Sequence, residues 1–268
     1  GSTSYSSDIS ANAIVSVDIS GSLVTSLGWG AFNGCSSLTS ITIPDSVTSI
    51  DGEAFYGCSS LTGFTIPDSV VEIKTSTFEA CSKLTNITIH DSVTSIGNQA
   101  FYQCGALLSV SIPNSVESIG VNAFSDCSLL NSVTIGTSVE TIGNSAFNNC
   151  AITNITIPDS VKSIGENAFR ECGSLTSISL PNNSEFTTIS NNIFRDCSKL
   201  TTITIPNSVT DVGNSVFDGC SSLATIYMSA TTVAALGVSF GVQSYKDSPS
   251  STEIANVNAN VIFRDSNG

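Results

Sequence analysis

The stretch "ITIPDSVTSIDGEAFYGCSSLTGF", residues 41–64, contains the unit that decides the fold. It returns as "ITIHDSVTSIGNQAFYQCGALLSV" at residues 87–110 and as "ITIPDSVKSIGENAFRECGSLTSI" at residues 155–178. A phenylalanine followed three residues later by a cysteine occurs nine times, with the cysteines 22–25 residues apart. A repeat this short cannot bury its apolar side chains alone, whereas stacked neighbours can. The period therefore predicts a repeat solenoid of nine coils, mainly β.

Apolar side chains within one repeat first alternate and then spread out. Ile41 and Ile43 are two residues apart, which places both on one face of a β-strand and turns Thr42 to the other face. Val47 and Ile50 are three residues apart and mark the return side of the coil. The pattern predicts one strand that packs inward, followed by a corner and a second inward-facing segment.

The Phe-x-x-Cys segments supply the predicted core. Phe55, Cys58 and Leu61 have the spacing of a 3₁₀ turn or a short α turn. We expect each phenylalanine and each cysteine to stack on its counterpart in the next coil. The predicted structural core includes Phe55, Phe78, Phe101, Phe124, Cys58, Cys81, Cys104 and Cys127.

Corner residues recur in the same phase as the core. A proline such as Pro44 ends the Ile-x-Ile strand, because proline donates no ladder hydrogen bond. Asp45 and Ser46 represent the next two columns, whose side chains are expected to bond to nearby backbone and fix the turn. A glycine column follows the second strand, where we expect a positive φ: Gly97, Gly120, Gly143, Gly165 and Gly213.

The nine cysteines are interpreted as free, buried thiols, with a paired or reactive set as the alternative. Neighbouring cysteines of stacked coils would lie within bridging range, but their Cβ vectors would run parallel. The chain has no CxxC pair and one histidine, His90, at a corner, so a metal column is not expected. Calcium between Asp45, Asp68 and Asp91 is an alternative that the Asp-Ser turn makes unnecessary. We predict no metal and no other cofactor.

Composition narrows the classes of partner. The net charge is −14 and only 11% of the residues are charged, which opposes non-specific binding to nucleic acid or to anionic membranes. No stretch approaches the length of a membrane span, and the first residues do not resemble a signal peptide. The start "GS" looks like a tag remnant, and "FRDSNG" reads as a cut within a longer chain.

Catalytic motifs are not found. The sequence contains no glycine-rich phosphate loop, no G-x-S-x-G, no HExxH and no second histidine. One histidine at a corner lacks the base-and-orienter pair that a nucleophile requires. We therefore predict no catalytic residues and no enzyme activity.

The unit I-x-I-P-x-S-V-x-x-I-G-x-x-A-F-x-x-C-x-x-L resembles the BspA-like leucine-rich repeat of the Treponema/Trichomonas type. The resemblance implies a right-handed coil over residues 13–226, with a degenerate first repeat and irregular caps at both ends. His90 and Gly136 depart from the pattern by replacing the corner proline, residues 180–190 carry two extra residues, and the segment from residue 150 is one residue short. Residues 1–12 are interpreted as a tag remnant with an N-terminal extension.

Residues 227–268 are predicted to cap the C-terminal end of the solenoid. "SATTVAALGVSF" at 229–240 could form a short helix, "YKDSPSSTE" at 245–253 a loop, and "ANVNANVIF" at 255–263 a last strand. Such a segment would cover backbone that otherwise invites edge pairing.

The resemblance also implies a function. It points to a non-enzymatic binding module of a surface or secreted adhesin, extracellular or at the cell surface, that recognises host, matrix or cell-surface proteins. One alternative is a structural stalk that presents another domain. A second is a Thr/Ser array that binds glycan or ice.

Candidate binding residues lie on two surfaces. The outward strand column is small and neutral, either as a ligand-matching hydroxyl array or simply as a soluble β surface; it contains Thr42, Thr65, Thr88, Thr134, Thr156 and Thr204. The column after each core phenylalanine offers Tyr56, Tyr102, Arg170 and Arg195, the two arginines forming a predicted basic spot near Lys162 and Lys199. The alternative for this second column is a solvated turn.

Overall fold

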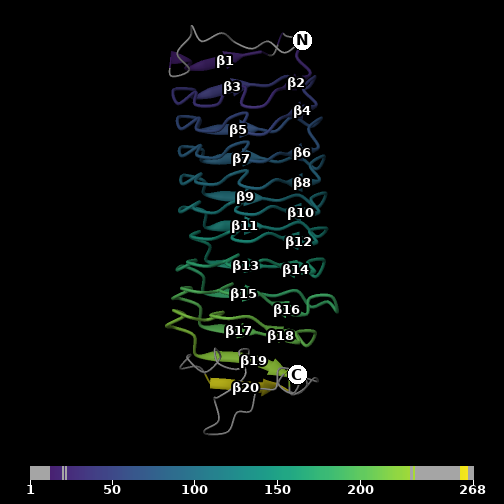
Figure 1. Cartoon of the computed structure of the whole chain (residues 1–268), viewed down its shortest axis with the longest axis vertical. Coiled ribbons are helices and arrows are strands. Elements are labelled where there is room, and N and C mark those ends of the chain that lie inside the picture. Colours follow the sequence, from purple (N-terminus) through teal and green to yellow (C-terminus); the bar gives the residue numbers. More distant parts are fainter. Residues whose placement is uncertain (1–12, 20, 22, 230–231, 233–259, 265–268) are drawn as a thin grey trace.

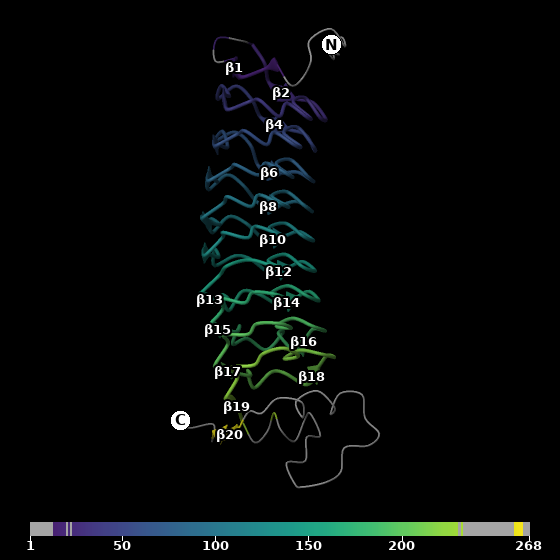
Figure 2. The ribbon, with the colours of Figure 1, turned by 90° about the vertical axis from the view of Figure 1, so that its left-hand side faces the viewer.

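The structure is a computed structural model that describes residues 13–19, 21, 23–229, 232 and 260–264. The chain winds into a β-solenoid whose coils stack into a nearly straight column (Figures 1 and 2). Each coil has a first strand on one side and a second, shorter strand on the other side. The predicted fold class is confirmed.

The strands are short and regularly spaced along the chain. The first strands are β1 (Ser16–Asp18), β3 (Ser40–Thr42), β5 (Gly63–Thr65), β7 (Asn86–Thr88), β9 (Ser109–Ser111), β11 (Ser132–Thr134), β13 (Asn154–Thr156), β15 (Ser177–Ser179), β17 (Thr202–Thr204) and β19 (Thr225–Ser229). The second strands are β2 (Ser26–Leu27), β4 (Ser49–Ile50), β6 (Glu72–Ile73), β8 (Ser95–Ile96), β10 (Ser118–Ile119), β12 (Thr141–Ile142), β14 (Ser163–Ile164), β16 (Thr188–Ile189) and β18 (Asp211–Val212).

Neighbouring coils pair in parallel and in register. Residues at the same place in the repeat face each other, as in Phe64 with Ile87 and Ile119 with Ile142. The second strands β6 to β14 form a five-stranded sheet, whereas the first strands pair mostly two by two. A last strand, β20 (Asn260–Arg264), pairs in parallel with β19, so the strand predicted at 255–263 is confirmed from residue 260 onward.

Two other expectations for the chain ends cannot be compared with the structure. The helix predicted at 229–240 lies outside the described residues except for Ser229 and Thr232, and the loop at 245–253 lies wholly outside them. The predicted tag remnant at residues 1–12 lies outside them as well.

Stacked phenylalanines run through the core as predicted. Rings of consecutive coils, from Phe32 to Phe217, have centroids 5.0–6.1 Å apart and interplanar angles of 1–19°. The two widest spacings, 6.1 and 6.0 Å, flank Phe194, whose coil follows the two-residue insertion. These stacked rings contribute packing and stabilising aromatic contacts at every coil boundary.

The nine cysteines are free and buried, which confirms the first interpretation of the thiols. From Cys58 to Cys220, each Sγ lies 3.0–3.2 Å from the carbonyl oxygen of the phenylalanine in the preceding Phe-x-x-Cys segment and donates a hydrogen bond to it. Burial raises the pKa of these thiols, that of Cys127 to about 12. The column therefore both fills space and links adjacent coils.

The Phe-x-x-Cys segments are hydrogen-bonded turns rather than the 3₁₀ or α turns expected from their spacing. The amide of Cys58 donates to the carbonyl of Phe55, but Gly57, which lies between them, has a φ of 68°. Non-glycine residues two before the phenylalanine or one before the cysteine, such as Glu53 and Ala80, have φ of 53–62°. These left-handed residues prevent the turn from continuing as a helix.

The glycine column has a different cause from the one predicted. Gly97, Gly120, Gly143, Gly165 and Gly213 are not among the residues with positive φ. A Cβ on Gly120 would lie 2.5 Å from the carbonyl carbon of Gly97. The backbone amide of Gly120 donates to the carbonyl of Ile96 at 2.8 Å. At these five positions the backbone of the preceding coil approaches too closely for a side chain, whereas the same column holds Asp51 and Lys74 in earlier coils.

The corner side chains join coils instead of closing their own turns. Ser69 Oγ donates to the carbonyl of Asp45 and Ser115 Oγ to the carbonyl of Val93, both at 2.7 Å. Asn114 Oδ1 accepts a hydrogen bond from the amide of Thr137, one coil later. The predicted backbone contacts exist, but they run along the axis of the solenoid.

Candidate binding surfaces

The outward threonines form one column on the first strands. All six are exposed, and the parallel register brings Thr65 opposite Thr88 and Thr134 opposite Ser111. Tyr227 ends the column and is half-buried. The structure thus brings together Thr42, Thr65, Thr88, Thr134, Thr156 and Thr204 as a row of hydroxyls that can donate and accept hydrogen bonds.

Tyr56 and Tyr102 lie on the turn side of the coils. Tyr56 is 37% exposed, and Tyr102 is half-buried. Partial burial raises the pKa of Tyr102, and the nearby Asp126 carboxylate raises it further. The two rings can therefore contact a partner only partly, Tyr56 more than Tyr102.

The basic spot predicted around Arg170 and Arg195 is wrong, because carboxylates neutralise both guanidinium groups. Arg170 Nη2 lies 2.8 Å from Glu171 Oε1. Arg195 Nε lies 3.4 Å from Asp218 Oδ2 and 3.6 Å from an oxygen of Asp196. This part of the surface carries balanced ion pairs rather than excess positive charge.

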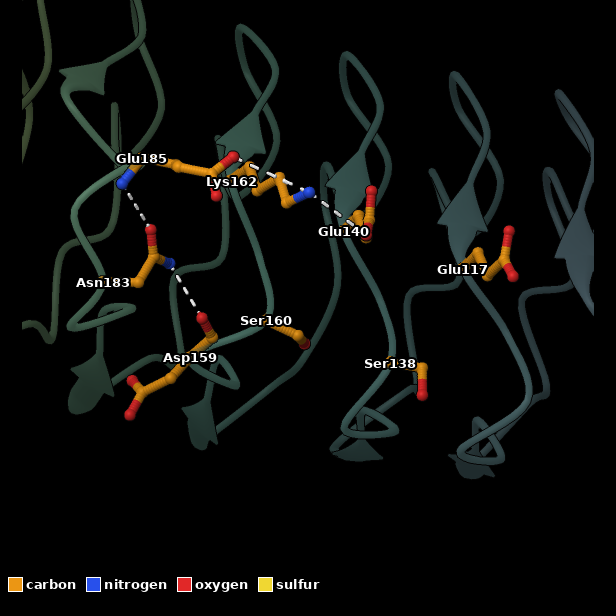
Figure 3. Close-up of a pocket in the computed structure, with 8 residues that line it drawn as sticks. All are labelled: Glu117, Ser138, Glu140, Asp159, Ser160, Lys162, Asn183 and Glu185. Atoms are coloured by element: carbon orange, nitrogen blue, oxygen red, sulfur yellow. Dashed lines mark hydrogen bonds and ion pairs between the residues drawn. The ribbon is translucent and has the colours of Figure 1, made fainter.

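Lys162 belongs to a different site, an open pocket of about 350 Å³ on the second-strand side (Figure 3). Its Nζ lies 3.2 Å from Glu140 Oε1 and 3.6 Å from Glu185 Oε2. These two carboxylates raise the pKa of Lys162, Glu140 most of all. Glu117 lines the same pocket one coil before Glu140, so the pocket remains acidic despite the lysine.

The two-residue insertion builds one wall of this pocket. Asn183 Nδ2 donates to the carbonyls of Asp159 and Val161, both at 2.8 Å. Asn183 Oδ1 accepts from the amide of Glu185 at 2.8 Å (Figure 3). It also accepts from the amide of Phe186 at 2.9 Å. Sequence reasoning noted the extra residues but not the pocket, although the 25-residue spacing was the available signal.

Trp29 is the exposed aromatic residue that sequence reasoning missed. It is 66% exposed in the first coil, two residues after the end of β2. It is also the single tryptophan of the chain, which was the signal available in the sequence. The first coil departs from the repeat, so its surface positions could not be aligned with those of the others.

Among the residues that the structure describes, no group of three or more His, Cys, Asp or Glu side chains is placed to hold a metal ion. His90 Nδ1 lies 2.8 Å from Asp68 Oδ1 at the corner. Within the same part of the chain, every helix is too short or too polar to cross a bilayer.

Solved structures of leucine-rich repeat proteins from other bacteria resemble the chain. A leucine-rich repeat protein from Bacteroides ovatus is 33% identical with a TM-score of 0.64, over 76% of this chain and 59% of the other. One from Eubacterium ventriosum is 26% identical with a TM-score of 0.58, over 73% of this chain and 62% of the other. This chain therefore spans about three fifths of the length of these relatives. A leucine-rich cell surface protein from Faecalibacterium prausnitzii is 30% identical with a TM-score of 0.48, over 78% and 72%.

Two further comparisons concern the sequence. No curated protein matches the chain. The family model described as "BspA type Leucine rich repeat region (6 copies)" matches residues 10–131 and 118–240, which is most of the sequence. The same residues carry the in-phase phenylalanine and cysteine columns described above. The chain belongs to the BspA-type leucine-rich repeat family.

Proposed function

We propose that the solenoid is a non-enzymatic binding module of a surface or secreted adhesin that recognises host, matrix or cell-surface proteins. The observation that carries the proposal is the continuous outward face of the first strands. It runs from β3 to β17, carries exposed hydroxyls along its length, and rests on a core whose inward strand residues are buried from β5 onward. Leucine-rich repeat solenoids commonly use such extended surfaces for protein recognition.

The face has the physical properties of a preorganised ligand surface. Its side chains are short, so they lose little conformational entropy when a partner binds. Each strand is tied to a neighbour by in-register backbone pairing, so the surface does not need to order on binding. The net charge of −14 suits a neutral or basic protein partner better than an acidic one.

The proposal is tested with purified protein against a panel of extracellular-matrix and cell-surface proteins. We expect saturable binding that is lost in the triple variant T88K/T134K/T156K, because three long cations would stand on the exposed face. The matched control is T141K/S163K/T188K, which adds the same charge to exposed positions of β12, β14 and β16. Folded protein that binds nothing on the panel would contradict the proposal and favour the stalk.

A second candidate is direct binding of glycan or ice by the same hydroxyl column. The in-register, nearly straight arrangement favours it, because hydroxyls then repeat at about the 4.8 Å strand spacing. Serines at 111 and 179 interrupt the threonines but keep the hydroxyls. Thermal hysteresis or glycan-array signal that disappears in T88K/T134K/T156K would support this function. If the activity survives in that variant, the binding surface lies on another face of the solenoid.

A further inference from the structure

Trp29 lies across the boundary between the first two complete coils. A Cβ on Gly52 would be only 2.5 Å from Cζ3 and 3.0 Å from Cε3 of the indole. The ring therefore rests on the backbone of Gly52, where any other residue would displace it. With 66% of the residue exposed, the indole presents an aromatic surface to solvent.

An ion pair stands beside the indole. Lys74 Nζ lies 2.6 Å from Asp51 Oδ1, and both side chains are a little more than one third exposed. Asp51 and Lys74 occupy the column that holds glycine at 97, 120, 143 and 165. The column therefore carries charged side chains in the coils that lie beside the tryptophan. This makes the surface of the first coils chemically different from that of the regular coils.

The indole and the ion pair line one open depression of about 480 Å³. Its other polar lining comes from Glu72, Thr75 and Ser95. The depression therefore combines a single aromatic plate with adjacent hydrogen-bond donors and acceptors. Sites for small ligands have this composition, an apolar surface with a few convergent polar groups that fix orientation.

We propose that this depression binds a neutral sugar ring, as part of an oligosaccharide, with its C–H face on Trp29. A pyranose has one apolar face and a rim of hydroxyls, each of which can donate and accept. Lys74 can donate to such hydroxyls, whereas Asp51 and Glu72 can accept from them. Neighbouring hydroxyls of one sugar can bond to Asp51 and to Lys74 at the same time. Neither charged group is then left without a partner when the sugar covers it.

Other ligand classes fit the depression less well. The net charge of −14 opposes a nucleic acid or a sulfated glycan. A quaternary ammonium group would be attracted to the indole, but Lys74 places a second cation beside it. An apolar peptide side chain would meet one aromatic residue surrounded by charged groups.

The inference goes beyond the proposed protein-binding function and concerns a different surface. Trp29 follows β2, whereas the outward threonines lie on the first strands, on the other side of each coil (Figure 1). The two proposals can therefore fail separately. Trp29→Ala should leave protein binding intact, and T88K/T134K/T156K should leave sugar binding intact.

Because Trp29 is the single tryptophan, its fluorescence reports on this site alone. The intact chain is titrated with soluble, neutral oligosaccharides: maltohexaose, cellohexaose, mannohexaose and chitohexaose. We expect at least one of them to give a saturable change in tryptophan emission. No change with any of the four overturns the proposal, and a change with tetramethylammonium alone replaces the sugar by a cation as the ligand.

Variants locate the binding independently of fluorescence. For the oligosaccharide that responds, calorimetry should show affinity weakened at least about tenfold in Trp29→Ala and in Gly52→Val, which displaces the indole. Lys74→Met keeps the fluorophore and should weaken the same affinity by removing a hydrogen-bond donor. Leu129→Ala removes another exposed apolar side chain and should change nothing. Equal affinity of wild type and Trp29→Ala, with both folded by circular dichroism, would overturn the assignment.

Discussion

The thiol of Cys104 donates a hydrogen bond to the backbone carbonyl oxygen of Phe78, at a distance of 3.1 Å and 26 residues earlier in the sequence. The same carbonyl accepts the amide of Cys81 within its own turn, so both of its lone pairs are used. Cysteine suits this position because it packs as a small apolar residue and still carries a weak donor. Alanine would lack the donor, and valine would lack it and add volume.

The thiols should be unreactive in the folded protein. Native protein is expected to resist alkylation at all nine cysteines, since each is at most 5% exposed and burial disfavours the reactive thiolate. Denatured protein should release nine reactive thiols in the same assay. Rapid labelling of most cysteines without denaturant would contradict the buried column.

Cys104→Asp should reduce the free energy of unfolding by several kcal/mol, about the cost of a buried unpaired charge.

Stability should fall at alkaline pH. The folded pKa of Cys127 is raised to about 12 from an ordinary value of 9.0, so above pH 9 the unfolded chain loses this proton while the folded chain keeps it. The unfolded state then binds fewer protons, and the free energy of unfolding decreases with pH by about 1.4 kcal/mol per unit for each such thiol. The loss should extend from about pH 9 to about pH 12 and is fully absent below that window.

One variant isolates the contribution of a single thiol to this slope. Cys127→Ala should lower stability at every pH but make the decline between pH 9 and 12 shallower by about 1.4 kcal/mol per pH unit. Urea unfolding in the presence of a reductant, followed by circular dichroism, measures both effects. An unchanged slope would show that the thiol of Cys127 titrates alike in the folded and unfolded states.

Gly120 should be intolerant of any side chain. Gly120→Ala forces a Cβ to within 2.5–2.8 Å of backbone and side-chain atoms of the preceding coil, so we expect a loss of about 2 kcal/mol or more in the free energy of unfolding. Gly105→Ala is the matched control, because its Cβ would meet nothing nearer than 3.6 Å. If positive φ were the reason for glycine, Gly120→Asn would be the milder substitution; we expect it to be at least as damaging as alanine.

Asn183 should be the most sensitive residue of the insertion. Its side chain makes four hydrogen bonds to backbone groups, so Asn183→Ala should lower the free energy of unfolding by about 2–4 kcal/mol. Asn182→Ala serves as the control, since Asn182 is exposed and uses its backbone amide, which the substitution retains. Equal unfolding midpoints for the two variants would show that the insertion does not depend on this side chain.

The repeated columns were predictable because one coil determines the next. Phe55 and Cys58 recur in phase, and stacking alone then places their counterparts in the core. The reason for Gly120 was not predictable, since the sequence gives its position in the repeat but not the distance between coil backbones. Arg195 and Asp218 occupy the same column of the repeat on neighbouring coils, 23 residues apart, but the sequence does not give the distance between their charged groups.

Surface sites were harder to predict than the core for a related reason. A repeat pattern identifies what is common to all coils, whereas Trp29, Lys74 and Glu185 are departures from it. Their importance depends on what lies beside them in the adjacent coil, which only the structure shows. Thr88 and Thr134 were placed correctly on the outward face because strand alternation alone determines their direction.

The uniform inter-coil hydrogen bonding has a mechanical consequence. The thiol bonds join residues 25–28 positions apart, and each coil is held only by its two neighbours. Tension applied to the two ends of such a chain loads the outermost coil boundary first, and the inner coils bear force only after it has opened. Each coil that peels away adds about 23 residues, or roughly 80 Å of extended chain, before the next one yields. Under sustained tension, the solenoid would lengthen in steps and absorb work while its remaining coils stay folded.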